Sequence, residues 1–331
     1  AAFSQGLPLA GRIGAELSLT GKWSLLQAAG KMTLAQGSIH DWRIDGFSTE
    51  IAAQRLGDGW LVRGRAGKGM IAGETLSDLT WAISQQGRQL QLQTLFARLG
   101  AGSLAAEGVL GPEAMDLRVL GAALPMRALA ANYPELQATG SLDFSGRLAG
   151  TADAVRTHGQ FLALDGMILS QPFTRASGNI GFANGTISLD GVEVKNGKGQ
   201  HQINGNVALS GNRAIDLKIT TRGARAEDLV ALLAPGEPLT GNVENEVVLG
   251  GTLDSIEADG KMTLWEGSYR GYLLTKASGA YRRAGGIISV DNFEVDSFNA
   301  KANITGSMDQ RKQLNFNIVA KDVEVAYIQL R

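Results

Sequence analysis

The sequence contains no cysteine and is poor in proline, aromatic residues and charge. Of its 331 residues, 7 are proline, 6% are Phe, Trp or Tyr, and 19% are charged. The lack of cysteine excludes disulfides, thiolate metal sites and cysteine nucleophiles. The 31 basic and 32 acidic residues nearly cancel, whereas a nucleic-acid-binding surface needs a clustered basic excess. No apolar run approaches the roughly 18 residues that a membrane-spanning helix needs.

Glycine is abundant instead. The chain has 44 glycines, about 13% of its residues against a typical ~7%. Apolar residues make up 44%, so the chain is too apolar to be disordered and too rich in glycine to be mostly helical. It begins Ala1-Ala2, without Met or a signal peptide, and we therefore expect a fragment of a longer protein.

The sequence repeats with a period of about one hundred residues. Four glycines of a middle copy recur 101 residues later, and they are preceded by four glycines 129 residues earlier: Gly140, Gly150, Gly159 and Gly166; Gly241, Gly251, Gly260 and Gly267; Gly11, Gly21, Gly30 and Gly37. The first two copies end 100 residues apart, at Val119 and Ile219, so the first copy carries 29 extra residues, which we place between Trp42 and Trp81.

These offsets predict three repeat units in one continuous array. The units are residues 1–133, which include the insertion of about 29 residues, residues 134–237 and residues 238–331. No Pro/Ser-rich linker separates them, and repeats joined this tightly usually share one extended core. We expect seven to nine strands in each unit.

Apolar and polar residues alternate within each unit, which is the pattern of strands with one apolar face. The stretch 161–164 is apolar throughout, so the facing of Phe161 rests on alignment with the other copies. We expect the following residues to line the apolar face: Leu17, Leu19, Met32, Leu34, Leu148, Phe161, Ile187, Leu189, Val207, Ile215, Leu217, Ile219, Val247, Leu249, Met262, Leu264, Ile288, Val290, Phe316 and Ile318.

Local signals place the turns, bulges and helices. Asp45-Gly46, Asp165-Gly166 and Asn184-Gly185 are typical of tight hairpin turns. The alternation slips by one residue at 189–192 and 290–293, which predicts a bulge in two copies. Short helices are expected only at unit ends, over 226–233 and over 124–129. The equivalent stretch of the third unit, 323–330, is too rich in β-branched residues to predict a helix.

The fold class that follows is all-β: an elongated, curled antiparallel or mixed sheet of tandem repeats with an apolar groove and short helices at the repeat ends. A sheet with one apolar face must bury that face. The sheet either folds over and fills itself as a sandwich, or forms a trough that an apolar ligand covers. Residues alone leave both possibilities open.

Candidates for chemistry are sparse. The three histidines, His40, His158 and His201, do not have metal-ligand spacing, and surface or turn roles are expected. Asp190/Glu193 and Asp291/Glu294 recur at one offset, as a calcium site would, but they lie at the expected bulges and should face water. The glycines of 64–69 and 191–199 are expected in turns, because neither stretch has phosphate-loop spacing. We expect no catalytic set, no metal, no cofactor and no enzyme activity.

The spacing of Leu-x-Gly followed by Gly-x-hydrophobic-x-Leu-x-x-Gly resembles the AsmA-like superfamily of diderm bacteria, and most closely its TamB family. The pattern is carried by 239–241 with 260–267, and by 30–37; the middle copy departs from it at Ala163. The resemblance covers essentially the whole chain. It implies a long curled sheet with a greasy groove, in the periplasmic part of a protein anchored in the inner membrane.

The resemblance also implies a function. The fragment would be a periplasmic bridge segment whose groove conducts phospholipid between the inner and outer membranes, supporting outer-membrane biogenesis. Its partners would be phospholipid acyl chains and an outer-membrane barrel protein of the TamA or BamA kind. Two alternatives stay open: a TamB-like scaffold for outer-membrane protein assembly and secretion, and an extracellular adhesin built from sandwich repeats.

Overall fold

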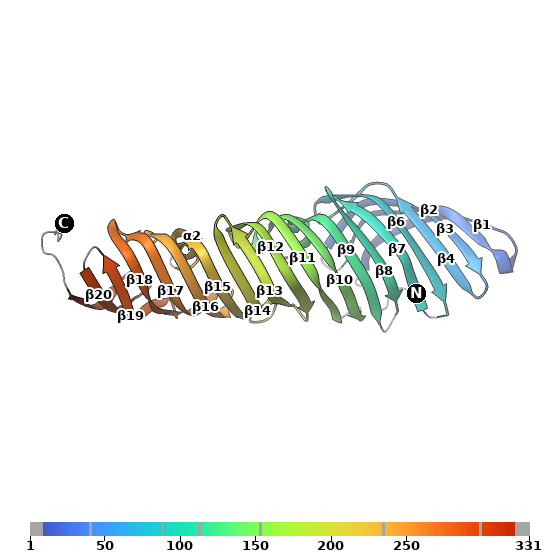
Figure 1. The fold of residues 1–331 in the computed structure, drawn as a ribbon. Helices are drawn as coiled ribbons and strands as arrows, with labels where there is room; N and C mark the ends of the chain where they lie inside the picture. The colour runs from blue at the N-terminus through green and yellow to red at the C-terminus, as the bar shows by residue number, and fades with distance from the viewer. Residues whose placement is uncertain are drawn as a thin grey trace. The chain divides into compact units, whose positions relative to one another are not determined.

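The fold is all-β, as the sequence predicts. The computed structural model describes residues 9–39, 42–87, 89–111, 114–151, 154–233, 236–297 and 300–321. These residues form twenty-one strands and two short α-helices, and every pairing between the strands is antiparallel within the parts described below. The chain divides into two compact units, residues 1–184 and 185–331, and Figure 1 labels most of their strands.

The strands of the first unit follow one another in the order of the chain, and each pairs antiparallel with the next except at one position that two short strands share. They are β1 (Leu9–Thr20), β2 (Gln27–Ile39), β3 (Trp42–Leu56), β4 (Gly59–Ala66), β5 (Gly69–Ile71), β6 (Glu74–Gln86), β7 (Gln89–Leu99), β8 (Gly102–Leu110), β9 (Met115–Pro125), β10 (Thr139–Thr151), β11 (Ala154–Ile168) and β12 (Gln171–Ala183). β4 and β5 occupy one strand position, since both pair with β3 and β6.

The second unit has the same meander. Its elements are β13 (Thr186–Asn196), β14 (Gly199–Ala208), β15 (Ile215–Arg225), α2 (Ala226–Leu233), β16 (Leu239–Thr252), β17 (Ser255–Tyr269), β18 (Tyr272–Ala284), β19 (Ile287–Ser297), β20 (Ala300–Met308) and β21 (Leu314–Lys321). Helix α2 forms where the sequence predicts a helix. The first predicted helix is shorter, α1 (Met126–Leu129). The stretch 323–330 lies outside the described residues.

The sequence offset recurs in the strands themselves. β11 to β14 begin 101 residues before β17 to β20, and β15 begins 99 residues before β21. Each of these two sets, counted with β10 and β16, has six strands in the described residues rather than the expected seven to nine. The expectation was too high because the strands are longer than assumed, up to 15 residues in β11 and β17. The first repeat, β1 to β9, has two more strand positions than either of the other repeats, and these additional positions lie between Trp42 and Gln86.

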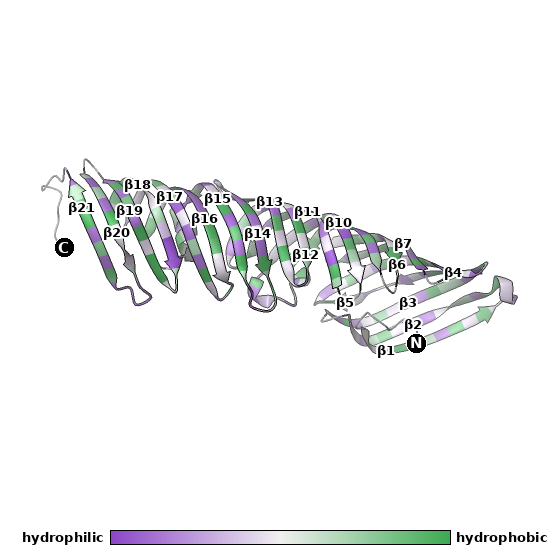
Figure 2. Ribbon diagram, turned by 90° about the horizontal axis from the view of Figure 1, so that it is seen from below, coloured by the Kyte–Doolittle hydropathy of each residue, from purple (hydrophilic) through white to green (hydrophobic). Residues whose placement is uncertain are grey.

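All twenty residues expected on the apolar face share one face within their unit. Directly paired residues of an antiparallel sheet point to the same side. In the second unit one such row runs from Gly205 through Leu217 to Leu249, and its neighbours alternate with polar residues such as Lys218 and Glu246. Figure 2 shows this alternation along the strands.

The packing within each unit involves a single layer of sheet. In the described clusters, the buried residues come from strands that are adjacent or one strand apart in the sheet and from the adjoining helix. One cluster joins Ala226 of α2 to Val243, Leu264 and Ala277 on β16, β17 and β18. A sandwich would instead bring together strands from two facing sheets.

Two of the turn predictions were wrong. Asn184-Gly185 forms a turn with positive φ at both residues. Asp45-Gly46 and Asp165-Gly166 lie inside β3 and β11 instead. Asp165 has φ 46° and stands where the register between β10 and β11 shifts, so this signal marks a bulge and not a reversal of the chain.

The two bulges predicted from slipped alternation are confirmed. The register shifts between Leu189 and Val192 on β13 and between Val290 and Phe293 on β19. In each bulge a side chain of the next strand accepts a hydrogen bond from the freed backbone N–H. Asn204 Oδ1 accepts from Gly191 at 2.7 Å, and Thr305 Oγ1 accepts from Asn292 at 3.2 Å.

Candidate functional site

The apolar face, defined by the twenty residues given above, is incompletely covered by protein. Four of them are buried: Ile215, Val247, Leu249 and Leu264. Leu17, Leu19, Phe316 and Ile318 are exposed, and the remaining twelve are partly exposed. A filled core would bury nearly all of them. The face therefore offers aliphatic surface that neighbouring strands alone do not remove from water.

Aromatic rings lie across glycines on this face. A Cβ at Gly64 would be 2.2 Å from the ring of Trp81, and one at Gly306 would be 2.6 Å from the Phe316 ring. In both cases the ring belongs to the strand paired with the glycine. At both positions, glycine thus leaves room for the ring of the paired residue to lie against the sheet.

An ion pair in the second unit joins residues at opposite ends of the strands. Glu237 precedes β16, and Lys312 lies between β20 and β21. In an antiparallel meander, β16 and β20 run in the same direction, so Glu237 lies where these two strands begin and Lys312 lies where they end. Lys312 Nζ nevertheless lies 3.2 Å from Glu237 Oε1, so the sheet is curved enough to bring these two side chains together.

Glu237 is the centre of a small cluster at this junction. Its side chain is only 8% exposed, and its Oε2 accepts hydrogen bonds from Tyr269 Oη at 3.0 Å and Arg270 Nη2 at 3.3 Å. Burial raises the pKa of the Glu237 carboxyl, but hydrogen bonds from Tyr269, Lys312 and Arg270 outweigh it and hold the pKa below its ordinary value. Glu237 is therefore ionised at neutral pH.

The histidines do not form a site together. His40 lies outside the described residues. His158 is exposed on β11 and pairs with Arg147 on the polar face. His201 is half-buried on the apolar face, where its Nδ1 lies 2.9 Å from Thr221 Oγ1. Burial lowers the pKa of His201, and the charge of Asp228 offsets part of that change.

The recurrent acidic pairs are exposed at the two bulges. Within the described part of the chain, no three His, Asp or Glu residues are grouped so that they could hold a metal ion. The glycine-rich stretch 191–199 forms a bulge and a hairpin turn, and 64–69 forms the ends of β4 and β5 with the break between them. Neither forms a helix-capping phosphate loop.

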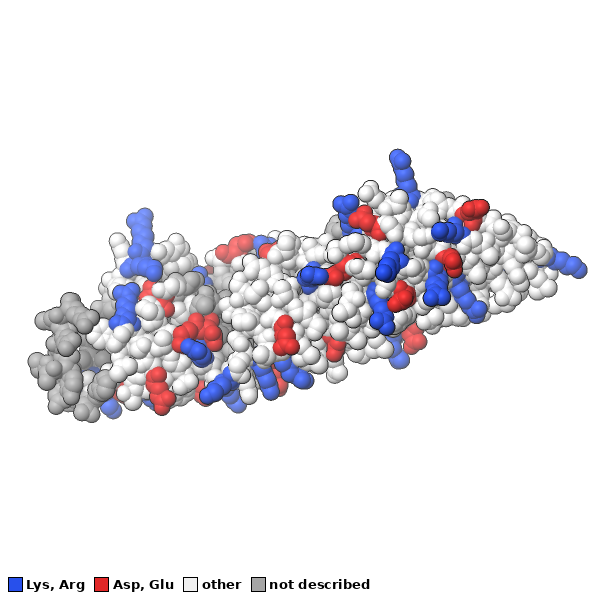
Figure 3. Space-filling view, turned by 90° about the horizontal axis from the view of Figure 1, so that it is seen from above, with Lys and Arg blue, Asp and Glu red and all other residues white. Residues whose placement is uncertain are grey.

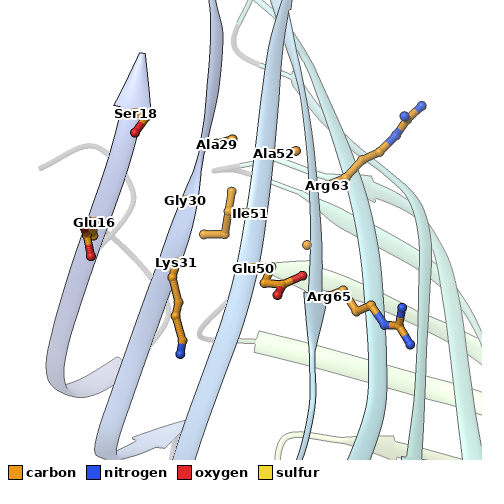
Figure 4. Close-up of a pocket in the computed structure, with 11 residues that line it drawn as sticks. Glu16, Ser18, Ala29, Gly30, Lys31, Glu50, Ile51, Ala52, Arg63 and Arg65 are labelled. Carbon is orange, nitrogen blue, oxygen red and sulfur yellow. The ribbon is translucent and has the colours of Figure 1, made fainter. Parts of the chain in front are cut away.

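The polar face carries charges of both signs. Figure 3 shows acidic and basic side chains interspersed on the side seen from above. In the first unit, Glu16, Lys31, Glu50 and Arg65 occupy successive strands in one paired row, and they line a shallow hollow over β1 to β4 (Figure 4). Opposite charges directly across strands favour this register.

Sequence reasoning missed the contact between Glu237 and Lys312 and the polar residues within the apolar face. No protein-family model, curated protein or solved structure matches this chain. No helix among the described residues has the length and apolar character needed to cross a membrane.

Proposed function

We propose that the apolar face binds the acyl chains of phospholipid, as a segment of a periplasmic path between the inner and outer membranes. The observation that supports this most is the incomplete burial of the face: twelve of its twenty residues are partly exposed and four are exposed. Paired rows extend this face over consecutive strands, and most residues of the opposite face are polar. An amphiphile fits such a surface with its tails on the sheet and its head group in water.

Burial of the tail supplies enough free energy for retention. Each methylene removed from water contributes about 0.8 kcal/mol, so a chain of about 16 carbons gains on the order of 10 kcal/mol before the costs of ordering it. No specific polar contact is needed for this. Movement along the face would be passive, because aliphatic rows of similar character give no preferred direction.

The resemblance to the AsmA-like superfamily supports the cellular setting of this proposal. In that setting the chain belongs to a periplasmic protein anchored in the inner membrane, and an outer-membrane barrel protein is its partner. Contact with either membrane would be made by other parts of that protein. The scaffold and adhesin functions remain alternatives, distinguished by the experiment below.

The experiment is mass spectrometry of organic extracts from the purified protein. We expect co-purified phospholipid in the wild-type extract, and much less with Leu217→Asp, which places a charge on the apolar face. Lys218→Asp is the matched control, since it adds the same side chain next to it on the polar face. Extracts without phospholipid would contradict the proposal; binding of unfolded barrel polypeptides, or a melting temperature that depends on calcium, would then favour the scaffold or the adhesin.

A further inference from the structure

Four polar side chains lie together on the apolar face of the second unit. They are His201 on β14, Thr221 on β15, Asn245 on β16 and Tyr281 on β18, and we call them the polar notch. The register pairs His201 with Thr221 and Thr221 with Asn245. Paired side chains of this kind have their Cβ atoms about 5 Å apart, so the notch is a contiguous polar site.

Two hydrogen bonds organise the notch. His201 Nδ1 lies 2.9 Å from Thr221 Oγ1, and Tyr281 Oη donates to Asn245 Oδ1 at 3.0 Å. Tyr281 reaches over β17 because Gly260 lies beneath it: a Cβ there would be 2.9 Å from the ring. The arrangement orients Asn245, with its amide oxygen held by the tyrosine hydroxyl.

The notch has hydrogen-bonding capacity left over. Thr221 is 1% exposed and Asn245 is 3% exposed. Asn245 carries two amide N–H donors, and among the described residues its only side-chain hydrogen bond is the one its oxygen accepts from Tyr281. The Asn245 amide nitrogen is not one of the fully buried side-chain atoms without a partner. Its N–H donors can therefore take an acceptor from a ligand.

The fold itself does not require polar residues at these positions. At the offsets found above, the middle copy has Phe144 in place of Asn245 and Ile180 in place of Tyr281. Phe144 stands on the same face, paired with Phe161. Since the same sheet positions hold apolar side chains in another copy, folding alone does not explain the polar residues of the notch.

The surroundings of the notch suit an amphiphile. On one side Val243 packs in the cluster that includes Ala226 of α2. On the other side Val247 and Leu249 continue the aliphatic rows. The notch itself is uncharged, because burial keeps His201 neutral at pH 7. A tail on these rows would bring the polar group attached to it against Asn245.

We propose that the polar notch binds a neutral acceptor oxygen next to an acyl chain, namely an ester carbonyl, through the Asn245 amide. This rests on the proposed function, since it names the part of the lipid that the second unit recognises. The uncharged donors favour a carbonyl over a phosphate, which arginine or lysine would hold better.

The test compares two lipids that differ only in the carbonyl. Binding of short-chain phosphatidylglycerol with ester-linked tails and of its ether-linked analogue is measured by native mass spectrometry. One hydrogen bond predicts that the wild-type protein binds the ester lipid about 3- to 10-fold more tightly. The variant Asn245→Leu with Tyr281→Phe should lose this preference and still bind the ether lipid. Asn242→Leu, the same change on the exposed opposite side of β16, should retain it.

The outcomes separate this inference from the proposed function. Equal wild-type affinities for the ester and ether lipids would overturn the inference and leave acyl-chain binding intact. Binding of neither lipid would overturn both. The wild-type comparison needs no variant, so it decides the matter even where the double substitution prevents folding.

Discussion

At the scale of single residues, glycine positions define where each repeat bends. One glycine in the first strand of each copy has positive φ and lies against a glycine of the next strand: Gly11 with Gly37, Gly140 with Gly166, and Gly241 with Gly267. The sequence predicts these columns because their spacing repeats. It does not tell a bulge from a hairpin, since both use positive φ, and for this reason Asp165-Gly166 was assigned to a turn.

Gly241→Ala should destabilise the fold by about 1–3 kcal/mol. Gly241 has φ 132°, and its added Cβ would be 2.8 Å from Gly267 Cα, a backbone atom that cannot give way easily. Gly250→Ala on the same strand is the control, because no atom lies within 4 Å of its added Cβ and its φ is not positive. Urea unfolding of both variants measures the difference. Equal urea midpoints for the two variants would show that the bulge at position 241 does not need glycine.

At the scale of elements, alternation predicted strand faces well and strand numbers poorly. The twenty face residues share one side within their units because period-2 patterning directly fixes which side chains point together. The number of strands depends on where the chain turns, and several glycines that signal turns lie inside long strands such as β11 and β17. The Glu237–Lys312 contact was beyond prediction, since it joins turn residues 75 positions apart that follow no alternating pattern.

The junction of Glu237 with Lys312 should make the second unit sensitive to acid. The Glu237 pKa is depressed in the folded protein because hydrogen bonds outweigh burial. Its contribution to stability is therefore complete above the ordinary carboxyl pKa of about 4.3 and is lost as the pH falls through the depressed value. We expect Glu237→Gln to lower the melting temperature at pH 7 and to match the wild type more closely near pH 3.

The matched control for this junction is Glu246→Gln on β16, an exposed carboxylate whose change should leave the melting temperature within about 1–2 °C at either pH. Melting curves followed by circular dichroism between pH 7 and pH 3 supply the measurement. If Glu237→Gln lowers the melting temperature equally at pH 3 and pH 7, the ionised Glu237 carboxylate does not stabilise this junction.

At the scale of the whole molecule, both units apply one design: a meander of antiparallel strands with an aliphatic face and a polar face. The sequence predicted this design and the candidate face, because both depend on local patterning. It missed the polar notch, since an asparagine, a threonine and a tyrosine on different strands look like ordinary alternation until the register pairs them. From this architecture we infer that the aliphatic face, and not the polar face, binds acyl chains.

The most direct measurement places a photoreactive amino acid at position 217 or 218 on β15 and counts covalent adducts with phospholipid. Leu217 pairs with Leu249 on the aliphatic face, and Lys218 pairs with Val248 on the other. Both positions lie on the same strand, so the two variants differ only in the direction of the probe. We expect lipid adducts at 217 and few or none at 218. Equal labelling at both positions, or none at 217, would contradict this expectation.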